Sequence, residues 1–111
     1  MEVSPIVICG LGDYGQCCLA KLQKFNLPII CIADEIPMWH DDILQCTFED
    51  QLFIGDMRKH STLRRAGVAR ARSVLILTSN IAVNLEAALE VRLINQKAND
   101  KMTSNLFLLS K

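Results

Sequence analysis

A glycine-rich turn between a buried apolar run and an amphipathic segment constrains the fold of this chain most. The run Ile6–Cys9 is uninterrupted and rich in β-branched residues, which is typical of a strand buried on both faces. Glycines follow at positions 10, 12 and 15, in the pattern G-x-G-x-x-G. Apolar residues then recur at helical spacing, at Cys18, Leu19, Leu22 and Phe25. The order strand, glycine turn, helix predicts the start of a βαβ unit.

Four further apolar runs are predicted strands, and helical segments lie between them. The runs are Pro28–Ala33, Gln51–Ile54, Val74–Leu77 and Leu106–Leu109. A short basic helix is predicted over residues 59–66, with Leu63 facing inward, and the longest helix over residues 82–96. Residues 36–50 show only a weak helical pattern around Trp39, Ile43 and Leu44. Alternation of this kind predicts a doubly wound α/β domain of the Rossmann type, a parallel sheet of about five strands with helices on both faces.

The composition narrows the class of protein. The 111 residues are 50% hydrophobic and 22% charged, and 12 basic and 12 acidic side chains give a formal net charge of zero. That apolar fraction is too high for a disordered chain. We expect no membrane span, since no apolar run approaches about 18 residues, and no signal peptide. Balanced charge argues against a nucleic-acid binder, which usually has a basic excess.

The five cysteines predict reduced thiols and no metal site. An odd count without a signal peptide is typical of cytoplasmic proteins, and the chain has no C-x-x-C pair for zinc. Cys9 and Cys31 lie in apolar runs and are predicted core residues. Cys17 and Cys18 lie near a helix start, where they either pack against the sheet or have a lowered thiol pKa.

The glycine loop is a predicted phosphate-binding site. In such loops the first glycine allows the tight turn, the second lets the backbone approach a pyrophosphate, and the third lets the helix pack closely on the strand. The helix N-terminus attracts the phosphates with its N–H groups and partial positive charge. The loop has no lysine or arginine, and the P-loop pattern G-x-x-x-x-G-K-[ST] is absent. The predicted binding residues here are Gly10, Leu11, Gly12, Asp13, Tyr14 and Gly15.

An acidic pair follows the second predicted strand. Asp34 lies 19 residues after Gly15, where dinucleotide-binding domains place the carboxylate that binds ribose hydroxyls. Its charge would repel a 2′-phosphate, so the sequence favours NAD or NADH over NADP. Glu35 is included in the predicted site. The alternative is that Asp34 only caps the next element.

Two further strand ends should face the same crevice, because ligands of open α/β sheets bind beyond the carboxyl ends of the strands. The predicted residues are Gly55, Asp56 and Met57 after the third strand, and Thr78, Ser79 and Asn80 after the fourth. For Asp56 the alternative is a helix or turn cap, and for Thr78 and Ser79 it is capping of the following helix.

Catalytic residues are not apparent. The single tyrosine, Tyr14, lies in the glycine loop with no lysine four residues on, and neither His40 nor His60 follows a predicted strand. We therefore expect a binding protein with no enzymatic activity.

The charges are segregated along the chain. Residues 34–56 contain seven of the twelve acids and no lysine or arginine. Residues 57–72 contain six of the twelve bases and no acid. The basic segment is either a solvated helix and turn, which is the simpler interpretation, or a docking surface for an acidic partner or second subunit.

The order of these motifs resembles the RCK, or KTN, domain of the TrkA-N type, the nucleotide-binding regulator of potassium channels and transporters. The similarity extends from residue 5 to about residue 110. Beyond the glycine loop it rests on four stretches, namely Cys31–Asp34, Gly55-Asp56 with Leu63–Val68, Ala71–Thr78, and Asn84–Ala88. The chain departs from the family pattern at residues 36–50 and at Asn80, Ile81 and Ala82, where members often have acidic residues.

The resemblance implies roles for the predicted site residues. The three glycines would hold phosphates and Asp34 the ribose. Asp56 and Met57 would lie by the adenine, and Thr78 and Ser79 by the phosphates or the second half of the ligand.

The resemblance also implies a function. NAD or NADH, or alternatively AMP, ADP or ATP, would bias a cytoplasmic homo-oligomer, a dimer or larger, that associates with a membrane potassium channel or transporter subunit. One alternative is the cofactor-binding half of an NAD-dependent dehydrogenase, and another is an assembly module that uses no ligand. We expect residues 1–111 to form one domain, either a minimal form or a fragment of a longer protein, whose last strand leaves an edge for a partner.

Overall fold

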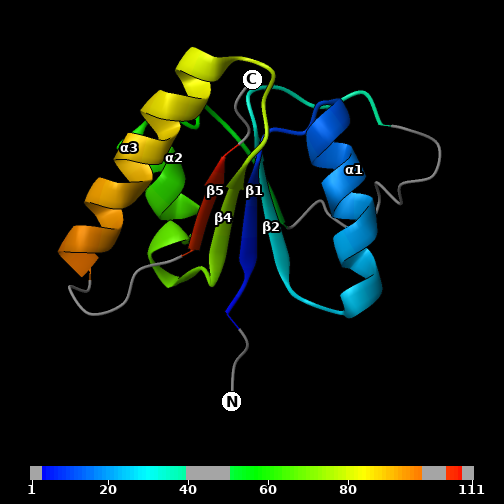
Figure 1. Cartoon of the computed structure of the whole chain (residues 1–111), viewed down its shortest axis with the longest axis horizontal. Coiled ribbons are helices and arrows are strands. Elements are labelled where there is room, and N and C mark those ends of the chain that lie inside the picture. Colours follow the sequence, from blue (N-terminus) through cyan, green and yellow to red (C-terminus); the bar gives the residue numbers. More distant parts are fainter. Residues whose placement is uncertain (1–3, 40–50, 99–104, 109–111) are drawn as a thin grey trace.

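The computed structural model describes residues 4–39, 51–98 and 105–108, and a five-stranded sheet lies at its centre (Figure 1). The strands are β1 (Ile6–Cys9), β2 (Ile29–Ala33), β3 (Leu52–Ile54), β4 (Ser73–Ile76) and β5 (Asn105–Leu108). Their order is β3-β2-β1-β4-β5, and all neighbouring pairs are parallel. The Rossmann-type doubly wound sheet is confirmed, and the ends of each strand lie within one residue of the predicted ends.

Helices cover both faces of the sheet. The helix α1 (Asp13–Leu22) lies on one side, and α2 (His60–Arg65) and α3 (Ile81–Ala98) lie on the other (Figure 1). Two short 3₁₀ helices, η1 (Gln23–Phe25) and η3 (Val68–Arg70), follow α1 and α2. This arrangement follows from parallel strands, since each crossover must leave the sheet and return over one of its faces.

Alternate residues of β1 enter two separate cores. Ile6 and Ile8 pack with Leu19 of α1, whereas Val7 and Cys9 pack in the cluster that contains Leu63 of α2 and Val91 of α3. Four consecutive buried residues therefore serve two faces, as predicted for a strand without a solvent side.

The end of the first helix differs from the prediction. The helical spacing places Phe25 on the inward face, but its side chain is 68% exposed. The chain tightens from α1 into η1 at Gln23, and Asn26 then takes a left-handed conformation with φ of 55°. The α-helix therefore ends at Leu22, and a spacing that assumes a continuous α-helix does not fix the position of Phe25 beyond that residue. The basic helix and its inward Leu63 are confirmed, and the weak pattern around Ile43 and Leu44 lies outside the described residues.

The four cysteines in the described residues differ in how deeply they are buried. Cys9 and Cys31 are buried as predicted, and burial, with a smaller effect of a neighbouring thiol, raises the pKa of each to about 12. Burial also raises the pKa of Cys18, with a smaller contribution from Cys17, so a lowered pKa at Cys18 is wrong. Cys17 is exposed.

In the described parts of the chain, no helix combines the length and apolar character needed to cross a bilayer.

Candidate functional site

A groove of about 710 Å³ opens at the carboxyl ends of the strands, where the order of the sheet reverses beside β1. This is the place where doubly wound sheets hold ligands. Every predicted site residue lines it except Gly15 and Glu35. Three lining residues were not predicted, namely Arg58, Leu77 and Val83. The structure thus brings four separate segments of the chain to one groove.

The first and third glycines shape the loop that leaves β1. Gly10 has φ of +103°, which L side chains rarely adopt, and a Cβ there would lie 2.8 Å from Cγ2 of Thr78. A Cβ on Gly15 would lie 1.8 Å from the carbonyl oxygen of Gly10, so only glycine lets α1 approach the loop this closely. Gly15 is therefore a packing residue under the groove and does not line it, in agreement with the role of a third glycine in such loops.

The second glycine leaves the start of α1 open to a ligand. Gly12 lines the groove and is exposed, and a Cβ there would meet no protein atom within 4 Å. It precedes the first residue of α1 and supplies no side-chain cap. A helix N-terminus of this kind attracts anions through its dipole and backbone amides.

A buried glutamine that the sequence analysis missed supports the loop. Gln16 of α1 is 2% exposed, and its Nε2 donates to the carbonyl oxygens of Leu11 at 2.9 Å and Met38 at 2.8 Å. The two carbonyls belong to the loops that follow β1 and β2. A polar residue on the buried face of an amphipathic helix is the signal that could have found it.

The acidic pair after β2 borders two hollows, and only Asp34 lines both of them. Asp34 is exposed and lines the groove together with the glycine loop. Glu35 does not reach it and lines a neighbouring hollow with Pro37 and Trp39. Glu35 thus lies outside the groove at the strand ends.

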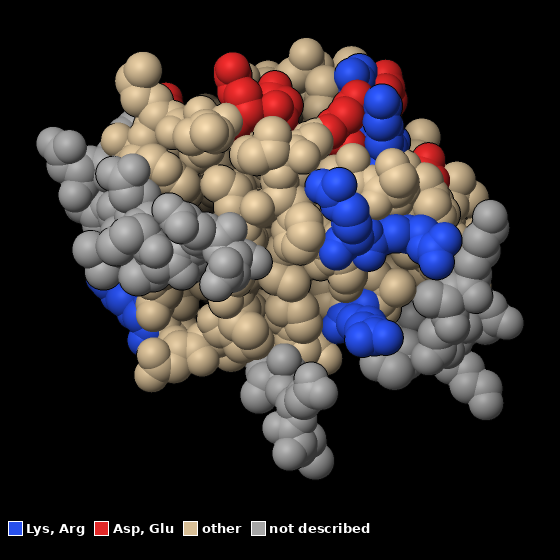
Figure 2. All heavy atoms as spheres, turned by 180° about the vertical axis from the view of Figure 1, so that it is seen from behind, with Lys and Arg blue, Asp and Glu red and all other residues tan. Residues whose placement is uncertain are grey.

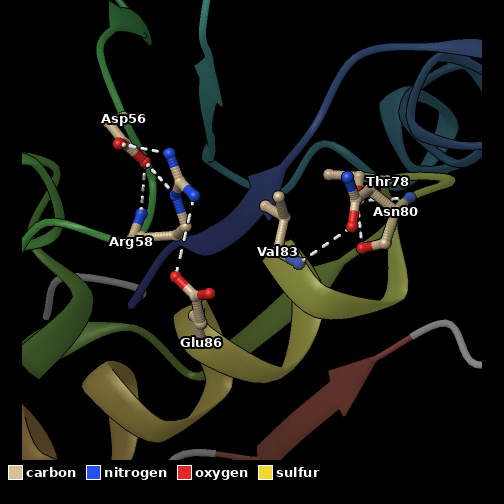
Figure 3. A network of polar contacts seen from close by, with 6 residues as sticks. All are labelled: Asp56, Arg58, Thr78, Asn80, Val83 and Glu86. Carbon is tan, nitrogen blue, oxygen red and sulfur yellow. Dashed lines mark hydrogen bonds and ion pairs between the residues drawn. The ribbon is translucent and has the colours of Figure 1, made fainter.

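Asp56 is engaged by an arginine from its own turn (Figure 3). Arg58 donates from Nε to Oδ1 and from Nη2 to Oδ2, both at 2.9 Å, and its backbone N–H also donates to Oδ1 at 2.9 Å. These bonds hold the pKa of the Asp56 carboxyl down at about 2. Nη1 of Arg58 lies 3.7 Å from Oε2 of Glu86 on α3. The groove therefore contains a cation that is already paired with two carboxylates.

The residues after β4 are tied to the start of α3 (Figure 3). The Asn80 side chain accepts a hydrogen bond from the Val83 N–H at 3.1 Å and so caps the helix. The Thr78 hydroxyl accepts from the Asn80 N–H at 3.1 Å and donates to the buried Asn84, whose Nδ2 donates back to the Thr78 carbonyl at 3.0 Å. Thr78 and Asn80 therefore have structural partners, whereas Ser79 is exposed at the groove.

The groove offers chemistry for binding a nucleotide. The glycine loop presents a helix N-terminus suited to phosphates, Asp34 presents a carboxylate suited to ribose hydroxyls, and Met57 and Val83 add apolar surface.

Comparison with known proteins identifies the family. A family model described as the TrkA-N domain matches residues 6–105, nearly the whole chain. This chain belongs to the TrkA-N family. The resemblance inferred from the sequence is thereby confirmed.

This TrkA-N domain is similar to parts of longer proteins. It is 27% identical over 96 residues to an uncharacterized protein of Methanothermus fervidus, covering 82% of this chain and 14% of that protein. The crystal structure of GsuK bound to ADP matches with a TM-score of 0.74 and 23% identity, over 95% of this chain and 24% of that one. The Shewanella denitrificans Kef CTD in AMP-bound form matches with a TM-score of 0.65 and 17% identity, over 95% and 56%. The domain thus spans less than two thirds of the length of each of these relatives.

Proposed function

We propose that this TrkA-N domain is a regulatory module that binds an adenine nucleotide or dinucleotide and thereby controls potassium transport. The observation that carries the proposal is the groove at the strand ends, which a glycine loop and a ribose-type carboxylate line together. Two similar structures are described with ADP and AMP bound, which supports an adenine nucleotide in the same fold. The predicted site residues that line the groove remain the proposed contacts, and Gly15 and Glu35 are left out of that set.

Two features bear on which nucleotide binds. Asp34 at the end of β2 favours ligands with free ribose hydroxyls, which includes NAD, NADH, AMP, ADP and ATP and disfavours NADP. Arg58 also lines the groove, but Asp56 and Glu86 already engage its guanidinium, so it gives little preference for a ligand with more phosphates. NAD or NADH is the ligand we expect from the fingerprint, and the mononucleotides are the alternatives.

The proposed mechanism needs no reaction on the ligand. A nucleotide that binds one conformation more tightly than another shifts the population toward it, by no more than the difference in its two binding free energies. Because the groove is formed by the loops after β1 and β2, the turn after β3 and the start of α3, a ligand in it contacts elements from both halves of the sheet.

The proposed partners are a potassium channel or transporter subunit and further copies of this chain, on the cytoplasmic side of the membrane. GsuK is described as a channel, and this domain matches about a fifth to a quarter of its length. A stripe of large aliphatic side chains on α3 supports self-association, because Ile81, Leu85, Leu89 and Leu93 are 40–66% exposed at four-residue intervals. We call this set the α3 stripe.

Calorimetry tests the proposal directly. The 111-residue chain is titrated with NAD, NADH, NADP, AMP, ADP and ATP, and thermal unfolding is followed with each ligand. We expect at least one of the nucleotides with free ribose hydroxyls to bind, and NADP to bind more weakly. The substitution Asp34→Asn should reduce the difference in affinity between that nucleotide and NADP. Absence of binding by all six at millimolar concentration would contradict the proposal. Oxidation of NADH with a substrate would instead favour the dehydrogenase alternative.

A further inference from the structure

The contacts between α3 and the segment before it follow a regular series. Glu86, Glu90 and Ile94 are spaced four residues apart, so they lie on one face of α3. Glu86 pairs with Arg58, and Oε2 of Glu90 lies 3.0 Å from Nδ1 of His60. The third position, Ile94, is apolar and 4% exposed. The series therefore has a carboxylate at its first two positions and none at the third.

Arginines gather where that carboxylate is missing. A groove of about 580 Å³ lies there and is lined by His60, Arg64, Arg65, Gly67, Ala69, Arg70 and Ile94. Lysine and arginine side chains cluster over this part of the molecule in Figure 2. In the described ranges no carboxylate lies within ion-pair distance of Arg64, Arg65 or Arg70. We call this the arginine groove, and it shares no lining residue with the groove at the strand ends.

The helix dipole explains only part of this arrangement. Arg64 and Arg65 occupy the last turn of α2, where a positive charge is favourable. Arg65 also lies over the Phe53 ring, 5.7 Å from its centre. Neither effect accounts for Arg70, which comes from η3 and lines the same groove. Three like charges around one hollow repel one another, and an anion between them would offset that repulsion.

We propose that the arginine groove binds a ligand with clustered phosphate groups, either a free phosphorylated molecule or the headgroup of a phosphorylated lipid. A guanidinium matches a phosphate with two parallel hydrogen bonds, which an ammonium cannot do. The volume lies in the range of small-molecule sites, and Ala69 and Ile94 supply an apolar part of the wall. A concave groove of this size suits a compact anion better than an extended acidic segment of a protein.

Amide NMR spectra of the ¹⁵N-labelled 111-residue chain test this site. The probes are sodium tripolyphosphate, hexaglutamate, and zwitterionic vesicles with or without phosphatidylinositol bisphosphate. We expect tripolyphosphate to shift the amides of residues 64–70 and Ile94, with an affinity that falls as salt is raised. A nucleotide in the strand-end groove would instead shift the glycine loop, so failure of either site is seen separately.

Two double variants of equal charge change complete the test. Arg64→Glu with Arg70→Glu should weaken tripolyphosphate binding at least about 100-fold, since a hydrogen bond to a charged group contributes roughly tenfold or more. Lys21→Glu with Arg92→Glu alters the charge equally outside the groove and should leave the affinity within about threefold. Comparison of tripolyphosphate with the phosphoinositide vesicles assigns the source of the phosphates.

Three results would overturn the proposal. They are shifts confined to the glycine loop, equal weakening by both double variants, and binding of hexaglutamate without tripolyphosphate, which would indicate an acidic protein partner.

Discussion

Gly12 and Gly15 stand three residues apart in one motif, yet they are constrained by different atoms. A Cβ on Gly15 would overlap the Gly10 carbonyl, whereas a Cβ on Gly12 would meet no protein atom. We expect Gly15→Ala to lower the free energy of unfolding by about 3 kcal/mol, because backbone must move. Gly12→Ala should change it by less than about 1 kcal/mol but weaken nucleotide binding at least about tenfold, by occupying the space of a phosphate.

Urea unfolding and calorimetry on the same two variants check this contrast. Gly67→Ala is a useful third variant, because a Cβ there would also meet no atom within 4 Å although φ is +81°. Any loss of unfolding free energy in this variant therefore measures backbone strain alone. Equal loss of stability in Gly12→Ala and Gly15→Ala would contradict the assignment of separate roles.

The Asp56 carboxyl should titrate well below an ordinary aspartate. Its pKa of about 2, against the usual 3.8, results mainly from the hydrogen bonds of Arg58. Because the folded pKa is the lower one, the stabilisation from this pair is present above about pH 4 and is lost as the pH falls toward 2. We expect Arg58→Gln to raise the pKa toward 3.8, as measured by carboxyl ¹³C NMR. Arg58→Lys keeps the positive charge but cannot donate the two parallel hydrogen bonds of a guanidinium, so it should give an intermediate pKa. An Asp56 pKa that stays the same in Arg58→Gln would show that Arg58 is not the cause of the shift.

Residue types at strand ends were predictable, but their partners were not. The glycine loop and Asp34 were found because their spacing is a property of the chain itself. Arg58 was missed because its role depends on the turn that brings it back onto Asp56 and toward Glu86 on another element. Gln16 was missed because one of its acceptors, the Met38 carbonyl, lies 22 residues away.

The start of α3 combines a cap with a wall of the groove. Asn80→Ala removes the bond to the Val83 N–H and should cost about 1 kcal/mol of unfolding free energy, measured with urea. Ser79→Ala at the exposed neighbour should stay within about 0.5 kcal/mol. Asn80→Asp should retain the cap and add a favourable charge at the helix N-terminus, yet weaken binding of a phosphate ligand by repulsion. A stable Asn80→Ala variant would show that the cap contributes little.

Elements buried on both faces were the most predictable. The strands were located within one residue because continuous apolar runs of three to six residues limit where a strand can begin and end. Phe25 was placed wrongly because the helical period was extended beyond Leu22, where α1 ends. Whether a helix tightens in its last turn depends on tertiary packing, which local spacing does not encode.

At the scale of the whole molecule, the α3 stripe is an outward apolar surface. If copies associate through it, Leu85→Lys with Leu89→Lys should shift the sedimentation coefficient toward that of a monomer, while the melting temperature of the chain stays within a few degrees, since both side chains are at least half exposed. Cys17→Lys with Phe25→Lys, two exposed sites in α1 and η1 away from the α3 stripe, is the matched control. Wild-type chain that sediments as a monomer at high concentration would contradict self-association.

The strand order also predicts which strands open most readily for amide hydrogen exchange. β1 is paired on both sides and buried on both faces, so its amides can exchange with deuterium only when the sheet separates as a whole. β3 pairs through three residues at the margin, and its Ile54 is 42% exposed. We expect exchange to be slowest in β1 and faster by orders of magnitude in β3. The glycine loop thus follows the strand that opens least readily, whereas the turn after β3 on the opposite side of the groove follows a strand that opens early. A nucleotide with its phosphates at the glycine loop and its adenine at that turn would therefore stay bound at the phosphate end while the adenine end exchanges.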